Sequence, residues 1–187
     1  MFPPSALHLH TAVDVLRHGG VIACPTEAVW GLSCDPFDAD AVDHLLALKR
    51  RPAAKGLIIV AASRDQVSFL LGDLSEEQRL ALDQTWPGPN TWLVPHCGRI
   101  PEFVCGDSDK VAVRVSAHPA VARLCLAFGG PLVSTSANHA GARPARHAFQ
   151  VWRYFGDGLD YLLPGSLGGA QRPSTIRDLE SGRVLRD

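Results

Sequence analysis

The stretch LKRRPAAKGLIIVAA, residues 48–62, holds the end of a predicted helix, a basic cluster and a predicted strand. Before it, Val42 and Leu45 repeat at helical spacing, and Pro52 then ends the helix. The apolar run 57–62 is rich in β-branched residues and does not alternate with polar ones, which predicts a strand covered on both faces. A helix followed by such a strand is the first step of the alternation of helices and strands that predicts the α/β class.

Helices and strands alternate through the rest of the chain. Periodicity and capping signals predict helices at 9–16, 38–51, 75–86, 118–130 and 145–156. Short apolar runs predict strands at 21–24, 91–95, 111–115 and 131–138, with a closing hairpin that turns at Ser181-Gly182. We found no repeat or linker, so residues 1–187 are predicted to form one domain with a mixed parallel and antiparallel sheet.

Composition excludes several classes of protein. The chain has 187 residues, of which 46% are hydrophobic, and its 18 basic and 19 acidic residues give a net charge of -1. Near-zero net charge argues against a generic nucleic-acid or membrane-surface binder. The five cysteines include no CxxC pair, so a disulfide framework or structural zinc site is not expected. The N-terminus is not typical of a signal peptide, and the expected location is cytoplasmic, with no membrane association.

Familiar catalytic motifs are absent from the sequence. It contains no G-x-G-x-x-G, no Walker A loop, no G-x-S-x-G elbow and no H-E-x-x-H. Three polar segments remain where strands begin or end: CPTEAVWGLSCDP (24–36), LKRRPAAKG (48–56) and LVSTSANHAG (132–141). Each alone can be a helix cap or a turn. Ligands gather at the carboxyl ends of strands in open α/β sheets, so the three together suggest a binding site.

These segments occur in a specific order with other motifs. PTEAVWGLSCDP, LKRRP, KGLIIV, WPGPNTWLVP, VAVRVSAHP, PLVSTSAN and PSTIRDL follow one another along the chain. With these motifs, residues 13–186 closely resemble the YrdC/TsaC family, the threonylcarbamoyl-AMP synthases. The resemblance implies a twisted mixed sheet flanked by helices, with a basic concave cavity. It also implies conversion of L-threonine, bicarbonate and ATP, with Mg2+, into threonylcarbamoyl-AMP and pyrophosphate. Downstream transferase proteins would then modify tRNA beside the anticodon.

The resemblance also assigns roles to individual residues. It implies nucleotide binding and catalysis for Lys49, Arg51, Ser136 and Asn138. It implies ATP-phosphate contacts for Ser174 and Arg186, and substrate contacts for Thr26, Arg114 and Ser134, with Arg114 as the partner of the threonine carboxylate. No residue is assigned as a metal ligand. The basic run at the end of the helix is then interpreted as a helix cap and a phosphate clamp together.

Two departures from longer relatives affect the amino-acid subsite. Those relatives have a histidine and a threonine where this chain has Val60 and Lys110. The chemistry needs no activated serine or cysteine, because the carbamate of threonine is itself the nucleophile. The protein must instead gather anions and neutralise the charge that develops on the leaving phosphates. The alternative is a non-enzymatic module that binds double-stranded RNA or tRNA, since a basic concavity also suits a nucleic-acid backbone.

Overall fold

The computed structural model describes residues 4–186, so residues 1–3 and 187 of the predicted domain lie outside it. Its longer helices are α1 (Ala6–Arg17), α2 (Ala39–Lys49), α4 (Glu76–Asp83), α6 (Pro119–Phe128) and α7 (Ala148–Phe155). Two single-turn helices, α3 (Ser68–Leu71) and α5 (Glu102–Cys105), and three 3-10 turns, η1 (Ala53–Lys55), η2 (Asp65–Val67) and η3 (Gly156–Gly158), lie between them.

The strands form one nine-stranded sheet in the order β7-β1-β2-β6-β3-β5-β4-β8-β9. Their bounds are β1 (Ile22–Pro25), β2 (Trp30–Ser33), β3 (Ile58–Ala61), β4 (Asn90–Pro95), β5 (Lys110–Val115), β6 (Leu132–Ser136), β7 (Tyr161–Leu162), β8 (Thr175–Asp178) and β9 (Val184–Arg186). Pairs β1–β7, β3–β5 and β4–β8 are parallel, and the other five are antiparallel. The predicted α/β class with a mixed sheet is confirmed.

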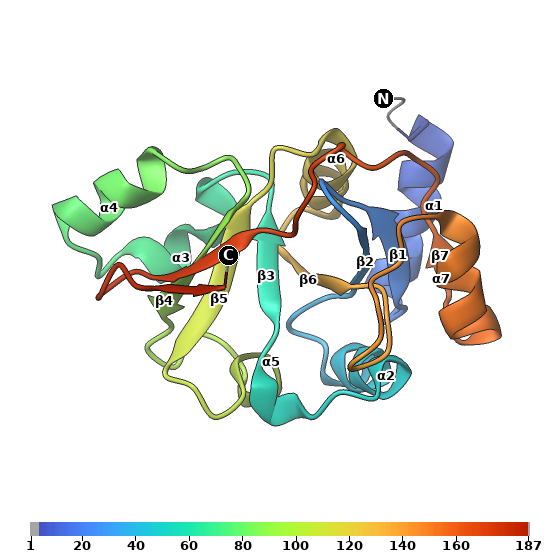
Figure 1. The fold of residues 1–187 in the computed structure, drawn as a ribbon, viewed down its shortest axis with the longest axis horizontal. Coiled ribbons are helices and arrows are strands. Elements are labelled where there is room, and N and C mark those ends of the chain that lie inside the picture. Colours follow the sequence, from blue (N-terminus) through green and yellow to red (C-terminus); the bar gives the residue numbers. More distant parts are fainter. Residues whose placement is uncertain (1–3, 187) are drawn as a thin grey trace.

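Two apolar clusters cover the two faces of the sheet. Helices α1 and α6 pack on one face, where Val60 contributes to their cluster. Helices α2 and α7 contribute to the other, larger cluster, which takes Ile59 and Ala61 from the same strand. Strand β3 is therefore buried on both sides, as its unbroken apolar run predicted. Figure 1 shows α3 and α4 at one end of the molecule and α1 and α7 at the other.

Most predicted elements agree with the structure, and the differences have local causes. Pro25 does not end the strand before it, because it pairs with Trp30 in a β1–β2 hairpin. Strand β2 was not predicted. The closing hairpin is present, but its loop spans residues 179–183 instead of a two-residue turn. The Asp178 carboxylate caps this longer loop by accepting hydrogen bonds from the backbone N–H groups of Glu180 and Ser181.

One irregular segment near the end of the sequence crosses the molecule. Residues 163–174, the crossover segment, lead from β7 at one edge of the sheet to β8 near the other (Figure 1). Gly168 N and Ala170 N donate to the carbonyls of Thr26 and Glu27 at 3.0 and 2.9 Å. The crossover segment is thereby attached to the turn between β1 and β2.

Candidate functional site

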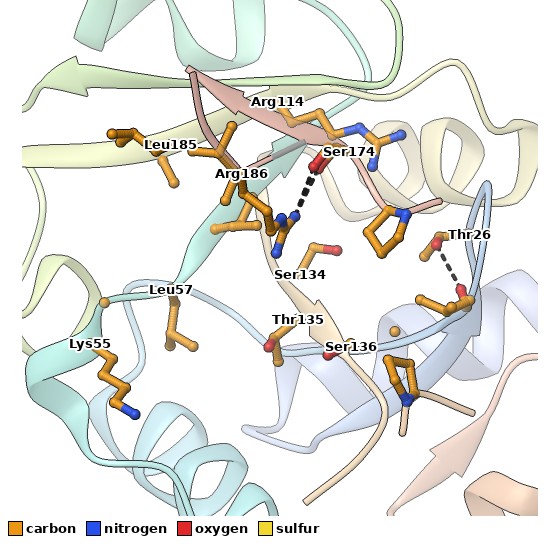
Figure 2. Close-up of a pocket in the computed structure, with 18 of the residues that line it drawn as sticks. Thr26, Lys55, Leu57, Arg114, Ser134, Thr135, Ser136, Ser174, Leu185 and Arg186 are labelled. Carbon is orange, nitrogen blue, oxygen red and sulfur yellow. Dashed lines mark hydrogen bonds between the residues drawn. The ribbon is translucent and has the colours of Figure 1, made fainter. Parts of the chain in front are cut away.

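A cavity of about 510 Å³ opens over the middle of the sheet. All three polar segments singled out in the sequence contribute to it, through residues 26–31, residues 51, 55 and 56, and residues 134–136. Strand β5, the end of the crossover segment and the β8–β9 hairpin complete its wall. In Figure 2, Arg114, Ser174 and Arg186 lie across the cavity from Ser134, Thr135 and Ser136 of β6.

Seven of the nine residues assigned by resemblance line this cavity: Thr26, Arg51, Arg114, Ser134, Ser136, Ser174 and Arg186. They come from six different parts of the chain. Lys49 and Asn138 are not among the lining residues. The structure therefore brings most of the predicted site together and places two of its members behind the wall.

The cavity is strongly basic. Six lining residues carry a positive side chain, and Glu27 is the one acidic residue among the lining residues that the structure describes; the six are Arg51, Lys55, Lys110, Arg114, Arg172 and Arg186. Burial lowers the pKa of Arg186, and the charges of Arg114 and Arg51 lower it further. Burial also lowers the pKa of Arg51. Arginines that repel one another in a partly buried space would be stabilised by a polyanion.

Arg51 is aimed into the cavity by the way α2 ends. Arg50 adopts a left-handed backbone conformation with φ of 52°, and Arg51 N then donates to Leu46 O at 3.1 Å. This arrangement is a Schellman motif, which turns the chain sharply out of the helix. The Arg51 Nη2 donates to Gly56 O at 2.8 Å. Its Nε has no hydrogen-bond partner among residues 4–186, so a donor is left for an anion.

Lys49 supports the site from behind. Its side chain is 3% exposed, and Nζ donates to Ser136 O and, at 3.1 Å, to Asn138 O. Burial lowers the pKa of Lys49 to about 8, with a smaller contribution from Arg51. Asn138 is also turned inward, since its Nδ2 donates to Ala142 O at 2.9 Å. Both residues hold the loop after β6 in place.

The floor of the cavity is lined by small polar side chains of β6 and by Gly31 of β2. Ser136 pairs with Gly31 of β2, and Ser134 lies two residues earlier on β6. A Cβ at Gly31 would lie 3.1 Å from Thr26 Cγ2, so a larger residue would crowd this corner. The Thr26 hydroxyl donates to Val29 O at 2.7 Å, which fixes the β1–β2 turn.

The C-terminal hairpin supplies the opposite wall. Ser174 is buried, and its hydroxyl lies 2.8 Å from the Thr91 hydroxyl of β4. Arg186 of β9 donates from Nη2 to Ser174 O at 2.9 Å. Lys110 forms ion pairs with Asp178 and Glu180, and these carboxylates raise the pKa of Lys110. Part of the positive charge on this side is therefore neutralised within the protein.

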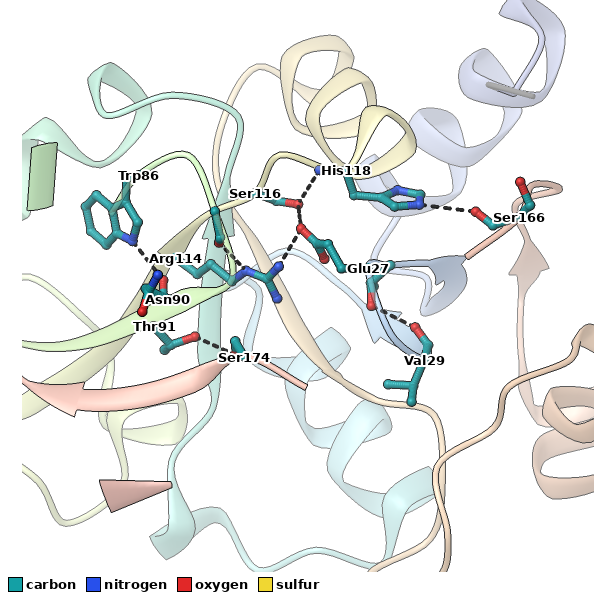
Figure 3. A network of polar contacts seen from close by, with 12 residues as sticks. Glu27, Val29, Trp86, Asn90, Thr91, Arg114, Ser116, His118, Ser166 and Ser174 are labelled. Carbon is teal, nitrogen blue, oxygen red and sulfur yellow. Dashed lines mark hydrogen bonds and ion pairs between the residues drawn. The ribbon is translucent and has the colours of Figure 1, made fainter. Parts of the chain in front are cut away.

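Arg114 lies beside Glu27, the one carboxylate among the described residues that line the cavity. Its Nε donates to Gly88 O at 3.1 Å, and its Nη2 forms an ion pair with Glu27. The side chains of Arg114 and Glu27 are 12% and 16% exposed. Figure 3 shows both groups with Ser116 and His118 in a connected set of polar contacts. An anion that binds Arg114 would therefore meet the Glu27 carboxylate as well.

Neither a metal cluster nor a membrane-spanning helix was found among residues 4–186. No group of three or more His, Cys, Asp or Glu side chains in that range could hold a metal ion. No helix in the same range has both the length and the apolar character needed to cross a bilayer.

Comparison with known proteins identifies the family. The model for Sua5, YciO and YrdC proteins, described as "Telomere recombination", matches residues 14–187. The chain belongs to the Sua5/YciO/YrdC family. The resemblance to YrdC seen in the sequence is confirmed. Within this family, a protein of Stutzerimonas stutzeri (strain A1501) named threonylcarbamoyl-AMP synthase is 59% identical over 172 residues, which cover 92% of each chain.

Solved structures of Sua5/YciO/YrdC proteins have the same fold. P. abyssi Sua5 complexed with L-threonine is 32% identical, with a TM-score of 0.89 over 95% of this chain. This chain spans 53% of the length of that Sua5 protein. E. coli YciO has a TM-score of 0.87, and at 22% identity it supports the fold alone.

Several residues that line the cavity were not predicted from the sequence. Glu27, Lys55 and Arg172 line it but were not assigned a role. Glu27 lies next to Thr26 in the P-T-E motif, where only Thr26 was assigned a substrate contact. Glu27 could have been recognised as a site residue because it is a carboxylate that follows a predicted strand, among motifs that are otherwise basic.

Proposed function

We propose that this chain is a threonylcarbamoyl-AMP synthase that acts on L-threonine, bicarbonate and ATP. The observation that carries the proposal is the cavity itself, with six basic side chains and one acidic side chain among its described lining residues. The names of the curated relatives and the fold shared with a threonine complex of Sua5 support it.

The chemistry fits a site that lacks a protein nucleophile. The amine of threonine and bicarbonate form a carbamate with loss of water. The carbamate carboxylate then attacks the α-phosphorus of ATP, and pyrophosphate leaves. The protein needs to hold three anions together and to stabilise the charge on the leaving phosphates. Arg51 and Arg186 both line the cavity and are suited to the phosphates, because arginine binds phosphate oxygens through paired N–H groups.

Neutral donors and supporting groups complete the proposed site. Ser136 and Ser174 would contact the nucleotide, while Thr26 and Ser134 would lie near threonine. Arg114 would bind the threonine carboxylate. We propose that Lys49 and Asn138 contribute by fixing the loop that carries Ser136.

Mg2+ is proposed to enter with ATP. The described lining residues include one carboxylate, Glu27, and its Oε1 is already bonded to Ser116 and Arg114. Mg2+ prefers several oxygen ligands in octahedral geometry, so this set does not fit a protein-held ion. The phosphates of ATP supply such oxygens, and Mg-ATP is therefore written as the substrate.

The product would pass to other proteins. We propose a cytoplasmic protein whose product is used by downstream transferase proteins that modify tRNA next to the anticodon. Direct contact with tRNA is part of the same proposal, because the basic wall of the cavity is compatible with a phosphate backbone.

Pyrophosphate release tests the function. ATP is supplied with L-threonine and bicarbonate together, and with each omitted in turn, while mass spectrometry follows the carbamoyl-adenylate. We expect release that requires both co-substrates. Release of phosphate or AMP without threonine would indicate a hydrolase. No release, together with salt-dependent RNA binding that survives Ser136→Ala and Asn138→Ala, would favour the RNA-binding module.

A further inference from the structure

Glu27 stands alone as a carboxylate in a cavity of cations. It is the one acidic group among the described residues that line the cavity, whereas six lining residues are basic. A positively charged group on a substrate would be repelled by most of this wall. It would be attracted only near Glu27.

The Glu27 carboxylate is held firmly by one of its two oxygens. Oε1 accepts a hydrogen bond from Ser116 Oγ at 2.6 Å and forms an ion pair with Arg114. The Ser116 hydroxyl in turn accepts from His118 N at 3.1 Å. The crossover segment fixes the turn that carries the carboxylate, since Ala170 N donates to Glu27 O at 2.9 Å. These contacts hold the carboxylate and the Arg114 guanidinium side by side (Figure 3).

The second oxygen of this carboxylate, Oε2, has no hydrogen-bond partner among residues 4–186. Glu27 Oε2 is buried and accepts no hydrogen bond from any residue that the structure describes. Buried polar groups normally have a partner, and a carboxylate oxygen without one is a strong acceptor. Its neighbour Arg114 is the group proposed to bind the carboxylate of threonine. The pair therefore offers a cation and a free carboxylate oxygen next to each other.

We propose that Glu27 binds the α-ammonium group of the amino-acid substrate through Oε2. The Arg114–Glu27 pair would then match the two opposite charges of an α-amino acid. This inference rests on the proposed function and adds to it the residue that selects for an amine. Without Glu27, the ammonium group would enter a cavity in which every charged side chain among the described lining residues is positive.

A substrate analogue separates this role from simple support of Arg114. 2,3-Dihydroxybutanoate has the skeleton of threonine with a hydroxyl in place of the amine. We expect calorimetric titration of the wild-type protein to give roughly 10–100-fold tighter binding of L-threonine, as one charge-assisted hydrogen bond provides. In Glu27→Gln this preference should fall to about threefold or less, because the neutral amide retains similar size but loses the charge.

Ser116→Ala is the matched control. It removes the donor to Oε1 and leaves Oε2 free, so the preference for threonine should persist. A wild-type protein that binds both ligands equally would overturn the proposal without any variant. Equal weakening of both ligands in Glu27→Gln would also overturn it, since Glu27 would then act only on Arg114. Either result could occur in a protein whose wild type releases pyrophosphate in a threonine-dependent way. Absence of that release in the wild-type protein would instead overturn the proposed function itself.

Discussion

Lys49→Met removes a buried charge and keeps an unbranched side chain that is one atom shorter. Lys49 is 3% exposed, and its ammonium group donates to the carbonyls of Ser136 and Asn138. Burial lowers its pKa from the ordinary 10.5 to about 8. Protonation of Lys49 therefore opposes folding at neutral pH, and methionine removes the group that is protonated.

The magnitude follows from the two pKa values. Between pH 8 and 10.5 the unfolded chain keeps the proton on Lys49 while the folded chain has released it. The stability that the titration of Lys49 contributes is therefore greatest above pH 10.5 and is lost as pH falls through 8. With these values, the free energy of unfolding should rise by about 2 kcal/mol between pH 7 and 9.5 on account of Lys49 alone. At pH 7 its two hydrogen bonds, about 1.5–3 kcal/mol each, offset most of the burial cost.

Urea unfolding of the wild-type protein and of Lys49→Met at pH 7 and 9.5 measures how much Lys49 changes the free energy of unfolding. We expect the wild-type protein to gain about 2 kcal/mol relative to Lys49→Met over that range, because all other titrating groups are shared. At pH 7 the two stabilities should differ by less than about 2 kcal/mol. Lys55→Met, at an exposed lysine of the same segment, serves as the control and should follow the wild type. Parallel curves for wild type and Lys49→Met would refute the reasoning.

Three further predictions concern the cavity and the hairpin. Arg114→Ala should raise the threonine concentration needed for half-maximal pyrophosphate release by about 10–100-fold with the KM for ATP unchanged, and unaltered threonine dependence would remove Arg114 from the site. Arg186→Ala should raise the KM for ATP by about 10-fold and leave that for threonine unchanged, whereas an equal rise in both would contradict a phosphate role. Lys110 lowers the pKa of Asp178 to about 2, so the stability that Asp178 contributes should be lost as pH falls from about 4 to 2. Asp178→Asn should show a shallower loss by circular dichroism over that range, and equal slopes would count against the ion pair.

The sequence predicted the elements that have a strong pattern of their own. Helix α6, with proline at its start and glycine after its end, follows standard capping rules. Strand β2 has no such pattern, since its four residues WGLS contain Gly31 and no β-branched side chain. It exists because β1 and β6 pair with it on either side. A strand that is defined by its neighbours is hard to recognise before those neighbours are placed.

In the candidate site too, features set by one segment of the chain were predicted, whereas contacts between segments far apart in the sequence were not. Motif residues such as Arg51 and Ser136 were grouped correctly because they lie in segments that end at the same part of the sheet. The pairing of Glu27 with Ser116 could not be predicted, because the two residues are 89 positions apart. The inward direction of Lys49 also depends on a loop far along the chain, whose carbonyls Nζ reaches.

The three adjacent basic residues at the end of α2 have three different roles. Lys49 turns inward and holds the loop after β6, and Arg50 takes the left-handed position that ends the helix. Arg51, one residue later, lies in the cavity wall, and its Nε has no hydrogen-bond partner within the described part of the chain. A helix end and an anion site are therefore not alternatives for this stretch. The sharp turn at Arg50 is what separates a supporting cation from a substrate-facing one, since side chains that continued the helix would differ in direction only by the helical step.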